Sequence, residues 1–219
     1  SELKFAVCKD GKPLRWERAA LPDDVVRDGV VASPAALGQF LKETVKERKL
    51  KRGACALVLP ATAAFFRRST MPAMTAEHVK LNLPYEFRDY ITEDRSKYVF
   101  DYALLHMEYD AQGAPASMDV MAAAALRETI ESYRDVLQYA GFTLETAVPE
   151  EAAYSNLLRA YEAENPAEEK REYCILDMGH SATRLYFYTG CAHEATQLID
   201  YGCATLDAAI AETFNVDVH

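Results

Sequence analysis

The residues with the clearest chemical potential form the motif Asp177-x-Gly179-x-Ser181-x-Thr183. The motif follows a short apolar stretch and precedes a stretch of alternating polarity, which predicts a turn between two strands. Glycine permits a tight turn and a close approach of the backbone to a ligand. Backbone N–H groups and the two hydroxyls would hold phosphate oxygens, and the Asp177 carboxylate would orient a water or a hydrated Mg²⁺. The pattern therefore predicts a phosphate-binding hairpin, with an ordinary polar turn as the alternative.

The composition narrows the classes of protein to consider. The chain has 219 residues, of which 50% are hydrophobic and 26% are charged, as in globular proteins with a sizeable core. A formal net charge of −10 argues against nucleic-acid binding, which uses basic surfaces. A run of six basic residues between 42 and 52 is interpreted as the solvated end of a helix. No stretch reaches the roughly 18 apolar residues of a membrane span, so direct membrane insertion is not expected.

Cysteine and histidine usage bears on redox state and metal binding. The five cysteines include no C-x-x-C pair, which favours reduced, buried thiols in a cytosolic protein over disulfides or a zinc site. The five histidines have no metal-ligand spacing, so no metal site is predicted.

The chain before residue 60 has the pattern of an α/β unit. Two strands are expected around the turn Asp10-Gly11, because this pair is a strong hairpin signal. Ser33 and Pro34 predict the N-cap and first position of a helix. The continuous apolar run at 54–59 predicts a strand covered on both faces.

Residues 61–141 have the pattern of an inserted α+β subdomain. Its first helix is expected at 75–90, and Pro84 is expected to kink it or to split it into two short helices. A second helix is predicted at 126–140, with Gly141 as its C′ residue.

After this segment, a strand and a helix lead to a polar, proline-containing linker at 164–171. The hairpin of the motif is then followed by a third strand, the turn Tyr201-Gly202 and a helix at 205–214. The order of strands followed by a helix therefore recurs on both sides of the linker, which suggests two structurally related lobes.

Several segments, taken in this order, resemble the PilM family of type IV pilus assembly proteins, which is related to the cell-division protein FtsA and to actin. The segments that carry the resemblance are 21–22 with 29–31, 57–60, 68–74, 85–91 followed by 101–102, 133–142, 149–153, 177–183 and 201–206. The resemblance implies an α/β fold of actin-like ATPase (ribonuclease H-like) lobes with an inserted α+β subdomain. In this scheme, 1–60 and 142–165 form the first lobe, 61–141 the insertion and 172–219 the start of an incomplete second lobe.

The resemblance also implies a site for ATP and Mg²⁺. The motif at 177–183 matches the family's second phosphate loop, and Gly202 lies in a turn that departs by one residue from the family pattern. Lys4 fits the end of the family's first phosphate loop, whose Asp and Gly are not in this chain. The adenosine-binding segment is not found either. We therefore expect a chain truncated at both ends that binds ATP weakly or not at all, whereas its longer parent should bind ATP.

The family resemblance implies a cytoplasmic scaffold, held at the inner membrane through a partner. Its groove near the inserted subdomain would bind a short cytoplasmic tail of a PilN-like inner-membrane protein, with ATP as modulator. Catalytic residues are not assigned, and ATP hydrolysis stays open. One alternative is a sugar- or acid-kinase-like phosphotransferase, for which Asp207 and Glu212 are the acidic candidates. Another alternative is an FtsA-like protein that self-associates into filaments.

Overall fold

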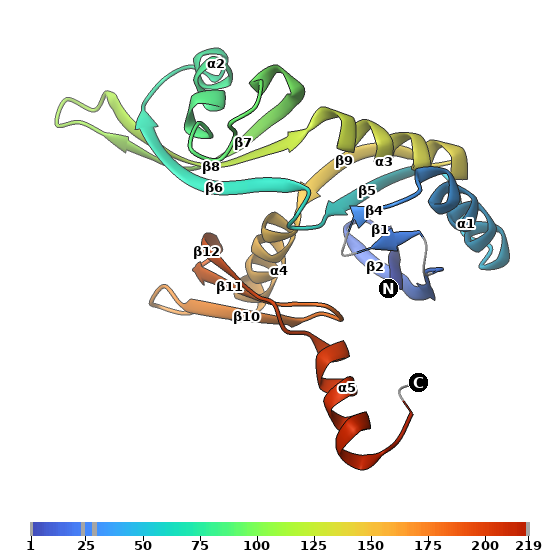
Figure 1. Cartoon of the computed structure of the whole chain (residues 1–219). Coiled ribbons are helices and arrows are strands. Elements are labelled where there is room, and N and C mark those ends of the chain that lie inside the picture. Colours follow the sequence, from blue (N-terminus) through green and yellow to red (C-terminus); the bar gives the residue numbers. More distant parts are fainter. Residues whose placement is uncertain (1, 23–24, 28–29, 218–219) are drawn as a thin grey trace. The chain divides into compact units, whose positions relative to one another are not determined.

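The computed structural model describes residues 2–22, 25–27 and 30–217, and these residues form two compact units (Figure 1). One unit consists of Ser1–Ala63 and Leu126–Val148, and the other consists of Ala64–Ala125 and Pro149–His219. Helix 126–140, which the sequence assigned to the insertion, thus lies in the first unit. The division into two lobes and an inserted subdomain stays a prediction.

The first unit is built from short strands and two helices. Its elements are β1 (Glu2–Lys9), β2 (Lys12–Ala20), β3 (Val26–Arg27), β4 (Val30–Val31), α1 (Pro34–Glu47), β5 (Ala54–Leu59), α3 (Arg127–Ala140) and β9 (Thr143–Pro149). β1 and β2 form an antiparallel hairpin, β3 pairs with β4, and β5 pairs with β9.

Local signals in the sequence set the ends of several of these elements. Asp10 and Gly11 have φ of 51° and 74°, the left-handed backbone that the Asp-Gly turn requires. The Ser33 hydroxyl accepts a hydrogen bond from the Ala36 N–H, so the predicted N-cap of α1 is confirmed. α3 ends at Gly141 with φ of 94°, where the predicted glycine avoids the strain of a side chain.

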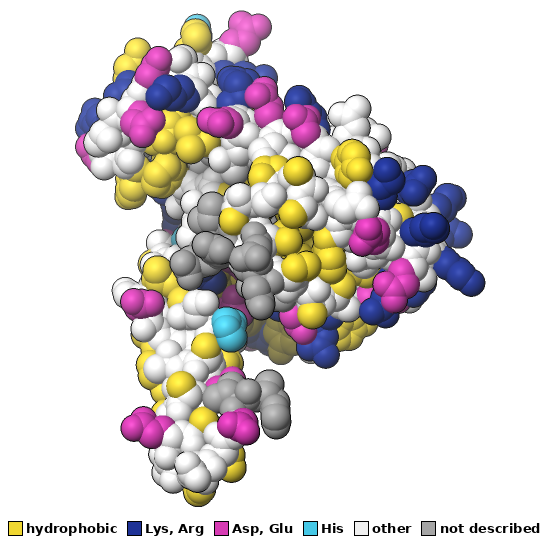
Figure 2. Space-filling view, turned by 45° about the vertical axis from the view of Figure 1, so that its right-hand side comes forward, with side chains coloured by type: hydrophobic (Ala, Val, Ile, Leu, Met, Phe, Trp, Pro, Cys, Tyr) yellow, Lys and Arg dark blue, Asp and Glu magenta, His cyan; other side chains and the backbone are white. Residues whose placement is uncertain are grey.

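The core of the first unit lies between α1 and α3, which pack against each other (Figure 1). Its buried residues are Val25, Leu37, Leu41, Val45, Val136 and Ala140. The basic residues that follow the last turn of α1 are exposed, as predicted for a solvated helix end. Figure 2 shows Lys and Arg side chains, in dark blue, gathered at the right-hand side of that view.

The prediction that β5 is covered on both faces is wrong for the described chain. Ala54, Ala56 and Val58 are exposed, and Val58 keeps 51% of its surface accessible. An apolar run makes burial of both faces of a strand possible. Whether a face is buried depends on elements distant in sequence that pack against it.

The second unit contains two three-stranded antiparallel sheets, with strand orders β6-β8-β7 and β10-β11-β12. The first sheet and its helices are β6 (Ala64–Pro72), α2 (Ala76–Glu86), the 3-10 helix η1 (Arg95–Lys97), β7 (Tyr98–Tyr109) and β8 (Pro115–Leu126). The second sheet and its helices are α4 (Glu150–Glu164), β10 (Glu172–Met178), β11 (Thr183–Thr189), β12 (Ala192–Ile199) and α5 (Cys203–Phe214).

α2 covers the β6-β8-β7 sheet, and of the two outcomes expected at Pro84 the split into two short helices is not found, while a kink stays a prediction (Figure 1). Pro84 lies inside a single helix that runs to Glu86. Its neighbours Leu83 and Phe87 are 1% and 0% exposed in the core. Burying these side chains offsets the hydrogen bond that proline cannot make near the end of the helix.

All five cysteines are free thiols. The prediction that the thiols are buried is wrong for Cys8 and Cys174, which are exposed. Cys174 shares the uncovered face of β10 with Leu176 and Met178, which are 57% and 55% exposed. The alternation of the strand, rather than its composition, therefore decides the exposure of this thiol.

Candidate functional site

The predicted phosphate motif forms the tight connection between β10 and β11. Met178 pairs with Thr183 at the end of the antiparallel ladder, and Asp177 lies directly opposite Arg184. The Gly179 N–H donates a hydrogen bond of 2.9 Å to the Ala182 carbonyl, which closes the loop. Asp177 is thereby held at the carboxyl end of β10, beside the turn.

This loop packs against the start of α5. The N–H groups of Cys203 and Ala204 donate to the carbonyls of Gly179 and His180, each over 2.9 Å. The Thr183 hydroxyl donates to the Tyr201 carbonyl over 2.6 Å. Two of the N–H groups at the start of α5 are therefore satisfied by the loop, and α5 fixes the position of the loop.

Two glycines make this contact possible. A Cβ atom on Gly202 would lie 2.4 Å from the His180 carbonyl oxygen, and one on Gly179 would lie 2.8 Å from the Ala182 carbonyl oxygen. Real Cβ atoms do not approach oxygen so closely, so both positions require glycine for steric reasons.

The loop presents three successive backbone donors. In the part of the chain that the structure describes, the N–H groups of His180, Ser181 and Ala182 form no hydrogen bond. Successive free N–H groups in a turn form a concave donor set that suits a phosphate. The Ser181 side chain is exposed beside them, whereas the Thr183 hydroxyl is occupied by Tyr201.

The remaining two predicted residues have separate places. Gly202 is the N-cap residue of α5, beside the loop. Lys4 lies on β1, in the other unit, where it is exposed and pairs with Arg18 in the hairpin register. The structure thus brings Asp177, Gly179 and Gly202 together with the two hydroxyl residues of the motif.

One face of the β10-β11-β12 sheet packs on α4 through tyrosines. Tyr186 and Tyr188 are 0% and 2% exposed, and burial raises the pKa of both. The Tyr186 hydroxyl donates to Glu150 Oε2 over 2.8 Å, and the Tyr188 hydroxyl donates to the Glu151 carbonyl over 2.9 Å. The Tyr154 ring lies 4.8 Å from the Tyr186 ring, between centroids. These contacts fix the start of α4 against the hairpin.

Glu150, Glu151 and Arg184, which the sequence did not assign to the site, lie at this contact between α4 and the sheet. Glu151 is 6% exposed, and burial raises its pKa, with the Glu150 charge adding to the rise and Arg184 opposing it. Burial also raises the pKa of Tyr154 to about 12, and the charges of Asp177 and Glu150 contribute. Glu150 and Glu151, directly after Pro149, were the sequence feature that could have pointed to these residues. Acidic residues are common at the starts of helices, so the pair did not stand out as part of a site.

A buried histidine joins the two sheets of the second unit. His193 on β12 is 5% exposed, and its ring lies 5.5 Å from the Phe66 ring of β6 and 5.4 Å from the Tyr188 ring. Its Nε2 lies 2.8 Å from Thr196 Oγ1. Burial lowers the pKa of His193, with the Glu194 charge opposing this effect. The neutral ring is therefore the form that the folded chain favours.

This burial predicts acid sensitivity. Because the pKa of folded His193 is lower than the value of about 6.5 in the unfolded chain, acidification below about pH 6.5 protonates the unfolded state first and lowers stability. Glu151, with its raised pKa, changes stability in the opposite direction. The free energy of unfolding of the wild type should fall when the pH is lowered from 7.5 to 5.5. We expect this fall to be smaller in His193→Gln, by about 0.5–1 kcal/mol.

Urea unfolding of both proteins at the two pH values measures the difference. The matched control is His78→Gln on α2, where the side chain is exposed. Equal pH dependence of the wild type and His193→Gln would contradict the prediction.

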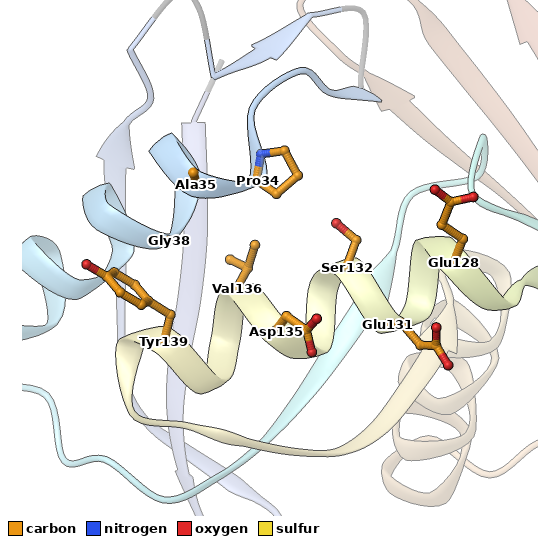
Figure 3. Close-up of a pocket in the computed structure, with 9 residues that line it drawn as sticks. All are labelled: Pro34, Ala35, Gly38, Glu128, Glu131, Ser132, Asp135, Val136 and Tyr139. Carbon is orange, nitrogen blue, oxygen red and sulfur yellow. The ribbon is translucent and has the colours of Figure 1, made fainter.

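A groove in the first unit lies between α1 and α3 (Figure 3). Its volume is about 590 Å³, and Pro34, Ala35 and Gly38 of α1 form one wall. The other wall is formed by residues of α3, namely Glu128, Glu131, Ser132, Asp135, Val136 and Tyr139. The apolar floor and three carboxylates suit a basic, partly apolar ligand. The sequence did not predict this groove, because two helices far apart in the chain form it.

Within the described residues, no group of three or more metal-ligating side chains is found. No helix of that same part is long and apolar enough to cross a membrane.

The sequence matches the model of the type IV pilus assembly protein PilM family over residues 8–219. A search of curated proteins gives no match. Among solved structures, a PilM–PilN type IV pilus biogenesis complex matches with a TM-score of 0.78 and 26% identity, over 100% of this chain and 64% of that chain. This chain therefore spans less than two thirds of that relative.

Two further structures share the fold at low identity. The cytoplasmic domain of EpsL, an inner membrane component of the type II secretion system of Vibrio cholerae, matches with a TM-score of 0.54 and 14% identity, over 99% of this chain and 72% of that chain. The ethanolamine utilization protein EutJ from Carboxydothermus hydrogenoformans matches with a TM-score of 0.52 and 14% identity, over 99% of this chain and 54% of that chain. Because the family match extends over nearly the whole sequence, the chain belongs to the PilM family of type IV pilus assembly proteins and has an actin-like ATPase fold.

Proposed function

We propose that this chain acts in the cytoplasm as an actin-like scaffold of type IV pilus assembly, binding the cytoplasmic tail of a PilN-like inner-membrane protein. The observation that carries the proposal is the family match, together with 26% identity to a relative whose structure is a complex with PilN. In this proposal the partner holds the chain at the inner membrane, and ATP modulates the interaction.

The loop between β10 and β11 supports the nucleotide part of the proposal. The N–H groups of His180, Ser181 and Ala182 and the Ser181 hydroxyl are donors for phosphate oxygens. The Asp177 carboxylate would hold a hydrated Mg²⁺, which neutralises phosphate charge when bound. Thr183 and Gly202 act by holding the loop on α5. Lys4 is proposed as a further phosphate ligand on the family resemblance.

The groove between α1 and α3 is proposed as the site of the partner tail. Glu128, Glu131 and Asp135 line it, and no Lys or Arg is among its lining residues. Lys42, on the neighbouring turn, has its ammonium 4.5 Å from the centre of the Tyr139 ring. The charge of the groove therefore favours a segment that carries a basic residue beside apolar ones.

The test is a titration of a fluorescently labelled cytoplasmic tail of the PilN-like protein from the same organism, followed by anisotropy. We expect saturable binding to the wild type and about tenfold weaker binding to Glu131→Lys, because reversal of one groove charge removes an attraction and adds a repulsion. Glu77→Lys is the matched control, since Glu77 is equally exposed but lies on α2. Addition of ATP–Mg²⁺ should change the tail affinity.

No binding of the tail to the wild type would reject the proposed function. Binding that is equal in the wild type and Glu131→Lys would reject the groove alone.

A further inference from the structure

Arg184 lies at the junction of the phosphate loop and α4. It is the second residue of β11, directly opposite Asp177 in the antiparallel register. Residues directly opposite on adjacent strands project from the same face of a sheet. Arg184 and Asp177 therefore share the face that packs on α4, beside the three free N–H groups of the loop.

Titratable groups of α4 and β11 lie within range of the Arg184 charge. Its charge acts on Glu151 and Tyr154 of α4 and on Tyr186 of β11. Glu150 belongs to the same group, since it accepts a hydrogen bond from the Tyr186 hydroxyl. Asp177, Glu150 and Glu151 therefore bring three negative charges to the side of the sheet that carries Arg184.

The Arg184 side chain makes no direct polar contact with these neighbours. Among the described residues, its guanidinium forms no hydrogen bond and no ion pair, although the side chain is half-buried. Arg68 in the same unit behaves differently, because it contacts Asp119 at 2.5 Å and Glu194 at 3.1 Å. The Glu151 Oε2 atom is also buried without a hydrogen-bond partner. The Glu151 carboxyl is not isolated, however, because a hydrogen bond with Thr196 lowers its pKa against the rise caused by burial. The half-buried Arg184 guanidinium, which has no hydrogen-bond partner among the described residues, is therefore the group that a ligand would complete.

We propose that Arg184 is a phosphate-binding residue of the nucleotide site, acting together with the loop N–H groups. The inference rests on the nucleotide part of the proposed function. A guanidinium offers a planar pair of donors that matches two phosphate oxygens, and its charge strengthens both hydrogen bonds. Because Asp177, Glu150 and Glu151 bring negative charge to the same side of the sheet, the phosphates would bind together with a divalent cation rather than as a bare anion.

The experiment compares wild type, Arg184→Ala and Arg184→Lys in the full-length protein, by calorimetric titration with ATP, ADP, AMP and adenosine, each with Mg²⁺ and taken to millimolar concentration. We expect Arg184→Ala to weaken ATP–Mg²⁺ binding by about 10- to 100-fold, because charge-assisted hydrogen bonds are lost. Arg184→Lys keeps the charge without the planar donor pair and should recover part of the affinity. Adenosine should bind all three proteins equally, and the ligand at which the variants diverge identifies the phosphate that Arg184 contacts.

Tyr186→Phe is the control for a structural role. It removes the hydrogen bond to Glu150 beside Arg184 but leaves every charge in place, so nucleotide affinity should not depend on it. Equal ATP–Mg²⁺ affinity in the wild type and Arg184→Ala would overturn the inference, and so would an equal loss for ATP and adenosine. If the wild type binds no nucleotide, the inference fails together with the nucleotide part of the function, while the tail titration still decides the role in pilus assembly.

Discussion

Replacing Gly202 with alanine is expected to separate α5 from the phosphate loop. The new Cβ atom would lie 2.4 Å from the His180 carbonyl oxygen and 2.6 Å from the Ser181 carbonyl carbon. The loop cannot yield easily, because its carbonyls accept hydrogen bonds from Cys203 and Ala204. Forcing a methyl group into such a contact costs about 2–3 kcal/mol.

Hydrogen exchange of the Cys203 and Ala204 amides measures this effect, because both hydrogen bonds break when the contact opens. Their protection should fall roughly 30- to 150-fold, since about 1.4 kcal/mol corresponds to a factor of ten. Gly113→Ala is the control. It strains the backbone, because Gly113 has φ of 80°, but its Cβ would meet no atom within 4 Å. The Cys203 and Ala204 amides should therefore keep their protection in this variant. Unchanged protection of the two amides in Gly202→Ala would show that the loop does not depend on this contact.

The second large effect is expected at Asp177. In the full-length protein, Asp177→Ala removes the carboxylate that would hold the hydrated Mg²⁺, and we expect ATP–Mg²⁺ affinity to fall about 10- to 150-fold. Stability should change little, because the Asp177 carboxylate forms no hydrogen bond or ion pair with any other described residue, and its backbone pairing in the β10–β11 ladder is unaffected by the substitution. Calorimetric titration of nucleotide and urea unfolding measure the two quantities.

Titration without Mg²⁺ separates loss of the cation site from damage to the loop. If Asp177 acts through the cation, ATP alone should bind the variant at least as well as the wild type, because a negative charge has been removed. An ATP–Mg²⁺ affinity that matches the wild type would leave the loop with a structural role.

Much of the local structure could be predicted because it depends on residues close in sequence. The turn at Asp10-Gly11 follows from the positive φ that these residues tolerate, and the start of α1 follows from a hydroxyl that reaches an N–H three residues on. The end of α3 at Gly141 has the same local origin. The hairpin around the motif was visible because alternation and glycine act within a few residues.

What the sequence determined by itself was thus most of the elements, the family resemblance and the position of the loop that we propose binds phosphate. The tertiary structure alone decided which groups stand around that loop. Thr183 matches a phosphate ligand in the motif, yet its hydroxyl is bound by Tyr201, 18 residues away. The Arg184 charge acts on Glu151 because the β10-β11-β12 sheet packs on α4, which lies before the linker in the sequence. Contacts between distant segments depend on packing and burial, and no local pattern in the chain records them.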